Sequence, residues 1–326
     1  MKVLLTGANG FLGSHILESL RTRNITTAVL LRPGSDRRFI QSHLSAIEVR
    51  SGSLDDPKIL GAAMAGVTHV IHCAGCTRAR RRSDFYQINH IGTKNVVQAV
   101  TARRGEVQRL LHVSSLAVNG PATQANPARE GDTSRPVSDY GKSKLAAEGE
   151  VLKNCQAAFT IIRPPAVYGP RDYGFLSMFK AVKAHLLPRP SKRQALSLVF
   201  AKDLAEAIVT CLESPAAAGK IYYAASPEVV TGRMMAEIIA TQLNSWTVPC
   251  PMPAMFLWPV CLFEQLRSQL NGKPRLLNLQ KFAELRASGW VCDSSRLKDE
   301  IGFECSTSLD AGIAKTLKWY VEEKWL

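Results

Sequence analysis

The stretch Thr6-Gly7-Ala8-Asn9-Gly10-Phe11-Leu12-Gly13 decides the fold, because it places three glycines between an apolar run and a helical pattern. The run Lys2–Leu5 predicts a buried strand, and Phe11–Arg23 has the apolar spacing of an amphipathic helix. The first glycine permits a tight turn, the second lets the backbone approach a phosphate, and the third lets helix and strand pack closely. The helix N-terminus then presents free amides and a positive partial charge. This stretch predicts a dinucleotide site.

Short runs rich in Val, Ile and Leu alternate with helical patterns through the first two-thirds of the chain, which is typical of βαβ units. These runs are apolar throughout, as expected when helices cover both faces of a sheet. After Gly169 helical runs dominate, and the strand Lys220–Ala224 is assigned to a second lobe. We predict an α/β fold: a Rossmann-type doubly wound parallel sheet over 1–169, to which later elements can return, and a smaller mixed α/β substrate lobe over 170–326. The expected sheet strands are Lys2–Leu5, Thr27–Leu31, Ile47–Arg50, His69–His72, Leu110–Ser114 and Phe159–Arg163.

The composition is that of a globular protein, with 326 residues, 46% hydrophobic and 21% charged, and a mean hydropathy of −0.04. These values exclude collagen-like and wholly disordered chains. Eight dispersed cysteines are too few for a disulfide scaffold, and the chain opens on a strand rather than a signal peptide, so we expect a cytoplasmic protein. A net charge of +14 attracts phosphates, anionic lipid headgroups or nucleic acid, and does not by itself choose among them. Nucleic acid is not expected, because no helix-turn-helix, zinc finger or aromatic-basic strand is present.

The end of the second expected strand bears on which dinucleotide binds. An NAD site usually places Asp or Glu there to bind the ribose 2′-hydroxyl. Here Arg32 follows Leu31, and the first carboxylate is Asp36, beyond the strand end. A guanidinium suits a 2′-phosphate, although Arg32 could instead stack on adenine or face solvent. We therefore expect NADP(H) to be favoured, with NAD(H) as the alternative.

A tyrosine, a lysine and a serine form the expected proton-transfer group. Tyr140 and Lys144 lie four residues apart, hence on one face of a helix. A nearby ammonium favours tyrosinate, so we expect the pKa of Tyr140 to fall from about 10 toward the working pH. Ser115, at a strand end, offers its hydroxyl to the same substrate oxygen. The three groups predict proton transfer at an alcohol or a ketone.

Seven sequence blocks occur in a fixed order along the chain. They are Thr6-Gly7-x-x-Gly10-x-x-Gly13, His72-Cys73-Ala74-Gly75, Asn89-x-x-Gly92-Thr93, Val113-Ser114-Ser115, Tyr140-x-x-x-Lys144, Arg163-Pro164-Pro165-Ala166-Val167-Tyr168-Gly169-Pro170 and Ala201-x-Asp203-Leu204-Ala205. This ordered set resembles the extended short-chain dehydrogenase/reductase family, in the superfamily of NAD-dependent epimerases and dehydratases. The resemblance implies that Tyr140 is the acid/base, that Lys144 binds the nicotinamide ribose, and that Ser115 polarises the substrate oxygen.

The resemblance also implies which residues line the cofactor. Where the family usually has an Asp that accepts the adenine amino group, this chain has Ser53, so a hydroxyl replaces a carboxylate there. With Tyr140 and Lys144, the implied cofactor-binding residues are Gly7, Asn9, Gly10, Phe11, Leu12, Gly13, Arg32, Ser53, Leu54, Ala74, Gly75, Pro164 and Val167.

Two departures from the nucleotide-sugar members bear on the substrate. Those members typically carry Asn three positions after the Arg that matches Arg163, where this chain has Ala166. Sugar dehydratases follow the catalytic hydroxyl with Asp-Glu, where this chain has Leu116-Ala117. The Arg-Pro-Pro-x-x-Tyr-Gly-Pro form is more similar to the 3β-hydroxysteroid dehydrogenase and dihydroflavonol reductase branch, which acts on apolar alcohols and ketones. We therefore expect an NAD(P)-dependent oxidoreductase for a sterol-, flavonoid- or lipid-like substrate. A nucleotide-sugar epimerase or dehydratase and a non-catalytic NADP-binding regulatory protein are the alternatives.

Three further features concern metals, membranes and assembly. Cys73 and Cys76 form a C-x-x-C without a second pair at metal-ligand spacing, so no metal is expected. The stretch Trp246–Phe263 has no charged residue, and its prolines oppose a membrane-spanning helix. It is expected to be a buried helix-loop, an apolar lid or, with the basic segment Arg78–Arg82, a peripheral membrane contact. Members of the family often dimerise through two helices, so a homodimer is also expected.

Overall fold

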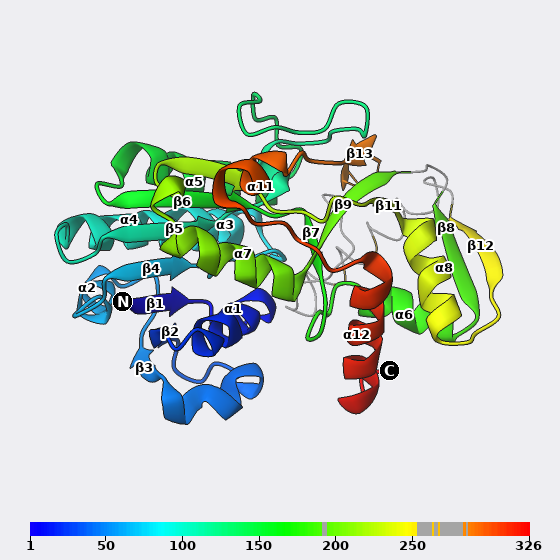
Figure 1. The fold of residues 1–326 in the computed structure, drawn as a ribbon, viewed down its shortest axis with the longest axis horizontal. Helices are drawn as coiled ribbons and strands as arrows, with labels where there is room; N and C mark the ends of the chain where they lie inside the picture. The colour runs from blue at the N-terminus through cyan, green and yellow to red at the C-terminus, as the bar shows by residue number, and fades with distance from the viewer. Residues whose placement is uncertain (191–193, 253–262, 264–266, 268–282, 285) are drawn as a thin grey trace.

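A seven-stranded parallel sheet between two layers of helices forms the larger lobe of this computed structural model (Figure 1). The structure describes residues 1–190, 194–252, 263, 267, 283–284 and 286–326. The strand order is β10-β6-β5-β4-β1-β2-β3, and all neighbouring strands are parallel. The predicted doubly wound Rossmann sheet is confirmed. Its strands are β1 (Lys2–Thr6), β2 (Thr26–Leu31), β3 (Glu48–Ser51), β4 (His69–His72), β5 (Arg109–Val113), β6 (Ala158–Arg163) and β10 (Lys220–Tyr223).

Apolar side chains from both faces of the sheet form two separate cores. One face packs against Leu17 of α1 and Ile208 of α7, and the other against Leu60 of α2 and Val97 of α4. Because both faces are covered, the strands can be apolar along their whole length. The helices and short turns of this lobe are α1 (Phe11–Thr22), the 3₁₀ segment η1 (Arg38–Ala46), α2 (Pro57–Ala63), α3 (Arg82–Phe85), the π-helical η2 (Tyr86–Ile91), α4 (Gly92–Ala102), η3 (Leu116–Val118), α5 (Asp139–Asn154), α7 (Ala201–Glu213), η4 (Pro215–Ala217) and α11 (Ser295–Ile301).

The second lobe is smaller and mixes short strands with helices. Its core gathers aromatic and aliphatic side chains such as Tyr168, Phe179 and Tyr320. One small sheet has the order β11-β9-β13, with β7 also paired to β9, and a separate pair joins β12 to β8. The elements of this lobe are β7 (Ala166–Tyr168), α6 (Leu176–Lys183), β8 (Leu186–Pro190), β9 (Ala195–Phe200), β11 (Val229–Thr231), α8 (Gly232–Gln242), β12 (Val248–Met252), β13 (Gly289–Trp290) and α12 (Leu309–Glu322).

Strand β10, which the sequence predicts as part of the second lobe, belongs instead to the sheet of the first lobe. Strand β10 pairs in parallel with β6, with Ile221 opposite Ile161, and becomes the seventh strand of the large sheet. Helix α7 likewise returns and packs against α1. The chain therefore leaves the large sheet after β6, builds part of the second lobe, and comes back.

The apolar stretch 246–263 is only partly described. Its residues 253–262 lie outside the described part, and Val248–Met252 form β12. Among the described helices, none combines the length and the apolar character needed to cross a membrane.

Candidate active site

The glycine turn after β1 has the close packing that a dinucleotide cradle requires. Gly7 has a φ of +77°, and a Cβ atom there would lie 2.6 Å from the Ala74 nitrogen. A Cβ at Gly13 would lie 1.9 Å from the Gly7 oxygen, so helix α1 approaches the turn as closely as its backbone allows. Gly10, the residue immediately before α1, provides no capping side chain, which leaves the first-turn amides directed at the space in front of them. These residues fit a pyrophosphate.

The loop after β2 offers a cation where an NAD site would offer a carboxylate. Arg32 is exposed, and no carboxylate of the described residues forms an ion pair with it. Asp36 is already engaged, because its carboxylate accepts from the Arg38 guanidinium at 2.5 Å and from the Arg38 amide at 3.0 Å. The Asn9 amide donates to the Asp36 carbonyl at 2.9 Å, which ties this loop to the glycine turn.

The other cofactor-binding residues implied by the sequence lie around the same edge of the sheet. Ala74 and Gly75 follow β4, whose neighbours in the sheet are β1 and β5. Ser53 follows β3, and its hydroxyl donates to Asp55 at 3.1 Å. The carbonyl of Pro164, after β6, accepts from the Leu116 amide at 2.8 Å. Leu54 packs near Gly92, and the side chain of Val167 packs against the core that contains α1. The carboxyl ends of parallel strands are where open α/β sheets bind ligands.

Tyr140, Ser115 and Lys144 come together at the carboxyl end of β5. Tyr140 lies in the first turn of α5, and its phenol is close enough to the Ser115 hydroxyl for that hydroxyl to lower its pKa. The ammonium of Lys144 donates to the Val113 carbonyl at 2.6 Å. Gly141 follows Tyr140 in α5, and a Cβ atom there would lie only 2.4 Å from the Ala117 oxygen. The helix therefore packs directly on the turn that carries Ser115.

The protonation of this group differs from the sequence-based expectation. Burial raises the pKa of Tyr140 to about 12, and the nearby Ser115 hydroxyl only partly opposes that rise. Burial also lowers the pKa of Lys144 to about 8. The predicted fall of the tyrosine pKa is therefore wrong for the protein without its cofactor, because burial is the largest influence on that pKa and Ser115 offsets only part of the rise. Tyr140 is a protonated phenol at neutral pH.

A buried asparagine, Asn89, which the sequence marks only as part of a motif, connects this group to the loop after β4. The Asn89 amide donates to the Ser143 hydroxyl at 2.9 Å and to the Cys76 carbonyl at 3.0 Å, and its oxygen accepts from the Cys76 amide at 2.7 Å. The Ser143 hydroxyl in turn donates to the Tyr140 carbonyl at 2.7 Å. The irregular π-helical turn η2 carries Asn89. Asn89 thus fixes the helix of Tyr140 against the cofactor side of β4.

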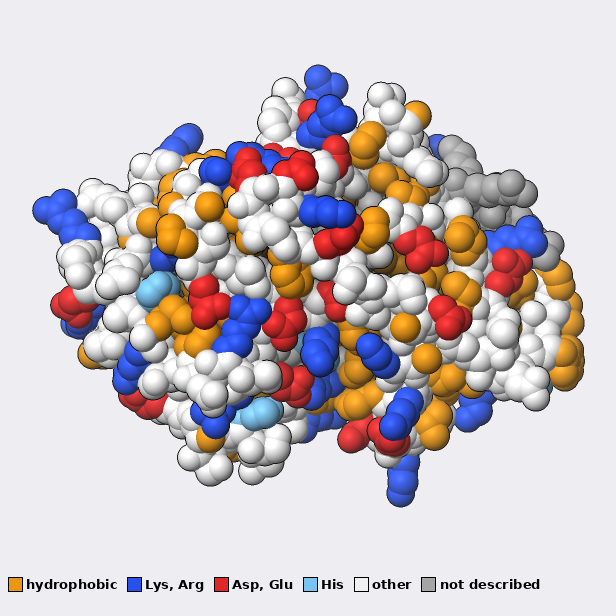
Figure 2. Space-filling model, in the orientation of Figure 1, with side chains coloured by type: hydrophobic (Ala, Val, Ile, Leu, Met, Phe, Trp, Pro, Cys, Tyr) orange, Lys and Arg blue, Asp and Glu red, His pale blue; other side chains and the backbone are white. Residues whose placement is uncertain are grey.

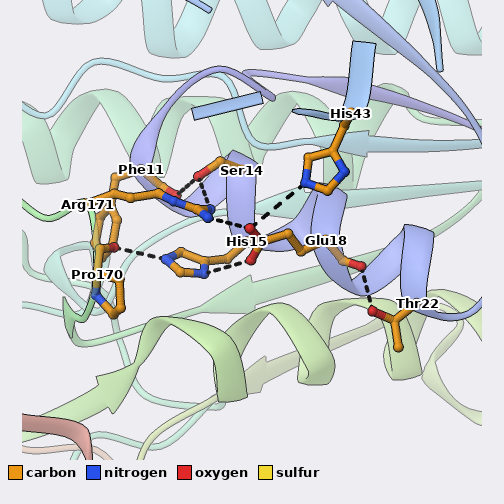
Figure 3. A network of polar contacts seen from close by, with 8 residues as sticks. All are labelled: Phe11, Ser14, His15, Glu18, Thr22, His43, Pro170 and Arg171. Atoms are coloured by element: carbon orange, nitrogen blue, oxygen red, sulfur yellow. Dashed lines mark hydrogen bonds and ion pairs between the residues drawn. The ribbon is translucent and has the colours of Figure 1, made fainter. Parts of the chain in front are cut away.

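A polar network holds the second lobe against the helix that follows the glycine turn (Figure 3). The His15 ring nitrogen lies 3.0 Å from the Pro170 carbonyl, and Arg171 donates to the Ser14 hydroxyl at 3.0 Å. Arg171 also forms an ion pair with Glu18. Burial acts to raise the pKa of Glu18, but the hydrogen bonds with His15 and Arg171 outweigh it and lower that pKa to about 2. The carboxylate therefore stays ionised, and the network fixes how α1 meets the segment after β7.

Comparison with known proteins agrees with this geometry. A model of the NAD dependent epimerase/dehydratase family matches residues 3–225, more than half of the chain. The chain is 29% identical to the UDP-glucose 4-epimerase of Vibrio cholerae, over 98% of this chain and 95% of that protein. It is 26% identical to the ceramide reductase of Caulobacter vibrioides, over 99% of this chain and 96% of that protein.

Solved structures show the same fold. The UDP-glucose 4-epimerase of Thermus thermophilus, in complex with NAD, superposes with a TM-score of 0.77 over 98% of this chain and 99% of that one, at 23% identity. The extended short-chain dehydrogenase/reductase pattern expected from the sequence is confirmed. The glycine turn, the order of the strands and the match to the family model all indicate the same family. This chain belongs to the NAD-dependent epimerase/dehydratase family and is an NAD(P)-dependent enzyme.

Proposed function

We propose that this enzyme interconverts a secondary alcohol and a ketone on an apolar, sterol- or lipid-like molecule, with NADPH as the preferred cofactor. The observation that carries the proposal is the closeness of the Tyr140 phenol to the Ser115 hydroxyl, beside the buried Lys144. The three side chains lie at the carboxyl end of β5, on the same edge of the sheet as the glycine turn. When bound, the nicotinamide cofactor supplies or accepts a hydride. A substrate oxygen held by both hydroxyls sits where a proton can be delivered to it.

Tyr140 acts as the proton donor in the reduction direction. Its pKa of about 12 keeps the phenol protonated at neutral pH, so it can donate to the oxygen of a carbonyl that becomes an alkoxide. Ser115 holds that oxygen with a second hydrogen bond. Lys144 is buried at the same place, and its ammonium stabilises the negative charge left on the tyrosine oxygen.

The side chains around this group support an apolar substrate more than a nucleotide sugar. Ala166 is exposed just after the turn that carries Pro164, and its methyl group can offer a sugar nucleotide no hydrogen bond. Leu116, where sugar dehydratases have an acid, is 3% exposed and packs with Tyr223 in an apolar cluster. The similarity to a ceramide reductase over nearly the whole chain supports the same substrate class.

The first test is turnover of a panel of hydrophobic ketones, measured as NADPH oxidation, alongside UDP-glucose with NAD. We expect NADPH to be consumed with at least one sterol- or long-chain ketone and no change in the sugar. The 29% identity to a UDP-glucose 4-epimerase makes the epimerase the second candidate. Conversion of UDP-glucose without net cofactor consumption, and no ketone turnover, would establish that candidate and reject ours.

Arg32→Ala tests the cofactor preference. Loss of a charge-assisted, two-pronged contact with the 2′-phosphate is expected to raise the Kd for NADPH roughly tenfold to a hundredfold. The Kd for NADH is expected to stay the same, because Asp36 is engaged by Arg38 and no carboxylate takes over. Both constants can be measured by titration of cofactor fluorescence. Equal affinities for NADPH and NADH in the wild-type protein contradict the preference.

A non-catalytic regulatory protein that binds NADP is the alternative from another class. Such a protein would bind cofactor but turn over nothing in the panel. The assembled Tyr140, Ser115 and Lys144 group argues against it, because a sensor gains nothing from a phenol placed to move a proton. The homodimer expected from the family remains a prediction.

A further inference from the structure

Apolar side chains are exposed on and beside the strand pair β8–β12, at the outer end of the second lobe (Figure 2). The exposed fractions are 68% for Trp246, 53% for Val248 and 46% for Leu186. Exposed apolar side chains that stand singly are ordinary, but these three are neighbours. In the parallel register Leu186 lies directly opposite Val248. We call this set the β8–β12 patch.

The β8–β12 patch points away from the core of its lobe. Successive side chains of a strand alternate between its two faces. Leu187, the next residue of β8, is 4% exposed and packs in the core with Phe179 and Ile239. Leu186 and Val248 therefore occupy the opposite, outward face, where folding alone gives no reason for apolar side chains.

Trp246 is held in place rather than left free. Its indole stacks on the His185 ring, with 4.1 Å between the ring centres and 5° between the planes. The His185 ring nitrogen lies 2.9 Å from the Trp246 carbonyl, and the Val248 amide donates to the His185 carbonyl at 2.8 Å. A fixed indole binds at low entropic cost, because little side-chain freedom remains to be lost.

The chain around the β8–β12 patch is basic and carries no acidic residue. The sequence from 175 to 200 contains five Lys or Arg and no Asp or Glu, and 238–263 contains no charged residue. Lys180 and Lys183 are exposed on the last turn of α6, which leads directly into β8. On the neighbouring helix α8, the carboxylate of Glu237 is paired with Arg233 at 2.6 Å. The surroundings therefore favour an anionic partner.

We propose that the β8–β12 patch, with Lys180 and Lys183, binds reversibly to the surface of a membrane that contains anionic lipids. An indole with a rigid polar neighbour suits the boundary between headgroups and acyl chains, and lysines beside it attract the anionic headgroups. This inference is independent of the substrate proposed above. It assigns the expected membrane contact to β8–β12 rather than to Arg78–Arg82, where Arg82 already contacts Asp139 at 3.4 Å and lies over the Tyr86 ring.

A second copy of the chain is a less suitable partner for the same patch. Stable protein–protein interfaces bury on the order of 1,000 Å² or more, well above what three side chains of this size provide. Two copies would also bring Lys180 and Lys183 of each close to those of the other, without carboxylates between them. A membrane surface provides both the apolar area and the negative charge that a second copy lacks. Its apolar layer is continuous, and its anionic headgroups lie at the level of the lysines.

Flotation with lipid vesicles tests the proposal on the full chain. We expect binding to vesicles of phosphatidylcholine with 30% phosphatidylglycerol (about one lipid in three), and little binding to phosphatidylcholine alone. Trp246→Ala is expected to weaken partitioning roughly tenfold, by removing the largest inserted side chain. Lys180→Gln with Lys183→Gln is expected to weaken it about 30-fold, at about fivefold per lysine, and high salt should do the same.

Matched controls separate the patch from general charge and exposure. Val321→Ser removes an equally exposed valine, 55% exposed, from α12 and is compared with Val248→Ser. Lys58→Gln with Lys153→Gln removes two exposed lysines from α2 and α5. Both controls should bind vesicles like the wild type, and all variants should keep the wild-type circular dichroism spectrum. Absence of binding to anionic vesicles, equal loss in the controls, or a concentration-dependent dimer abolished by Trp246→Ala overturns the proposal.

Discussion

Tyr140→Phe is expected to lower kcat by about 10²–10⁴-fold while the Kd for the cofactor stays near its wild-type value. The substitution removes only the phenolic oxygen beside Ser115 and leaves the ring in place, with its centre 6.2 Å from that of Phe85. Binding through the glycine turn does not involve this oxygen. Steady-state NADPH oxidation and a cofactor titration on the same sample measure the two effects.

The matched control for this prediction is Tyr222→Phe. It removes a hydroxyl that donates to Glu300 at 2.8 Å, on the outer strand of the sheet. We expect its kcat to match the wild type within about twofold, because the hydroxyl touches no part of the proposed site. Normal turnover by Tyr140→Phe contradicts the assignment of the acid/base, and equal loss in both variants would mean that any lost tyrosine hydroxyl disturbs the fold.

Glu148→Gln is expected to reduce the free energy of unfolding by about 3–5 kcal/mol. The Glu148 carboxylate is fully buried and accepts from the Arg163 guanidinium at 2.7 and 2.9 Å, while Arg163 lies over the Tyr223 ring at 5.8 Å. Burial alone would lower the pKa of Arg163, but the hydrogen bonds to Glu148 raise it, so the guanidinium stays charged. Removing the carboxylate leaves that charge buried without compensation. Urea unfolding followed by circular dichroism measures the change.

Two further variants test whether the loss of stability comes from the buried charge of Arg163. Glu237→Gln breaks an exposed pair with Arg233 and is expected to cost less than about 1 kcal/mol. The double substitution Glu148→Leu with Arg163→Met should recover much of the loss, because it removes both buried charges together. If Glu148→Gln is as mild as Glu237→Gln, the buried pair does not hold α5 against β6 as described.

The strands of the large sheet could be predicted from the sequence because each one is marked by its own residues. Continuous Val, Ile and Leu runs between glycine turns mark buried parallel strands, and the predicted His69–His72 coincides with β4. Strand β10 was also recognised as a strand, but its partner was not, because a hydrophobic run does not say which edge it joins. Strands β8 and β12 were missed because prolines, such as Pro188 and Pro249, rarely occur in paired strands.

The active-site residues were predictable by type and order but not by electrostatic state. A spacing of four residues places Tyr140 and Lys144 on one face of a helix, and this is independent of the surroundings. The pKa of Tyr140 depends on burial beneath segments distant in sequence, and these cannot be read from five residues. For the same reason the role of Asn89 was not recognised, since its partners Cys76 and Ser143 become neighbours only in the folded chain.

The late position of β10 in the chain bears on how the protein emerges from the ribosome. Strand β6 keeps an open apolar edge until residues 220–223 are synthesised, after β7, β8 and β9 have been made. A nascent chain stalled between those points presents an unpaired strand for other polypeptides to join, so chaperone cover is most needed in that interval. It also follows that recombination between relatives near residue 169 would separate β6 from its native neighbour, so crossovers that preserve the fold are expected elsewhere.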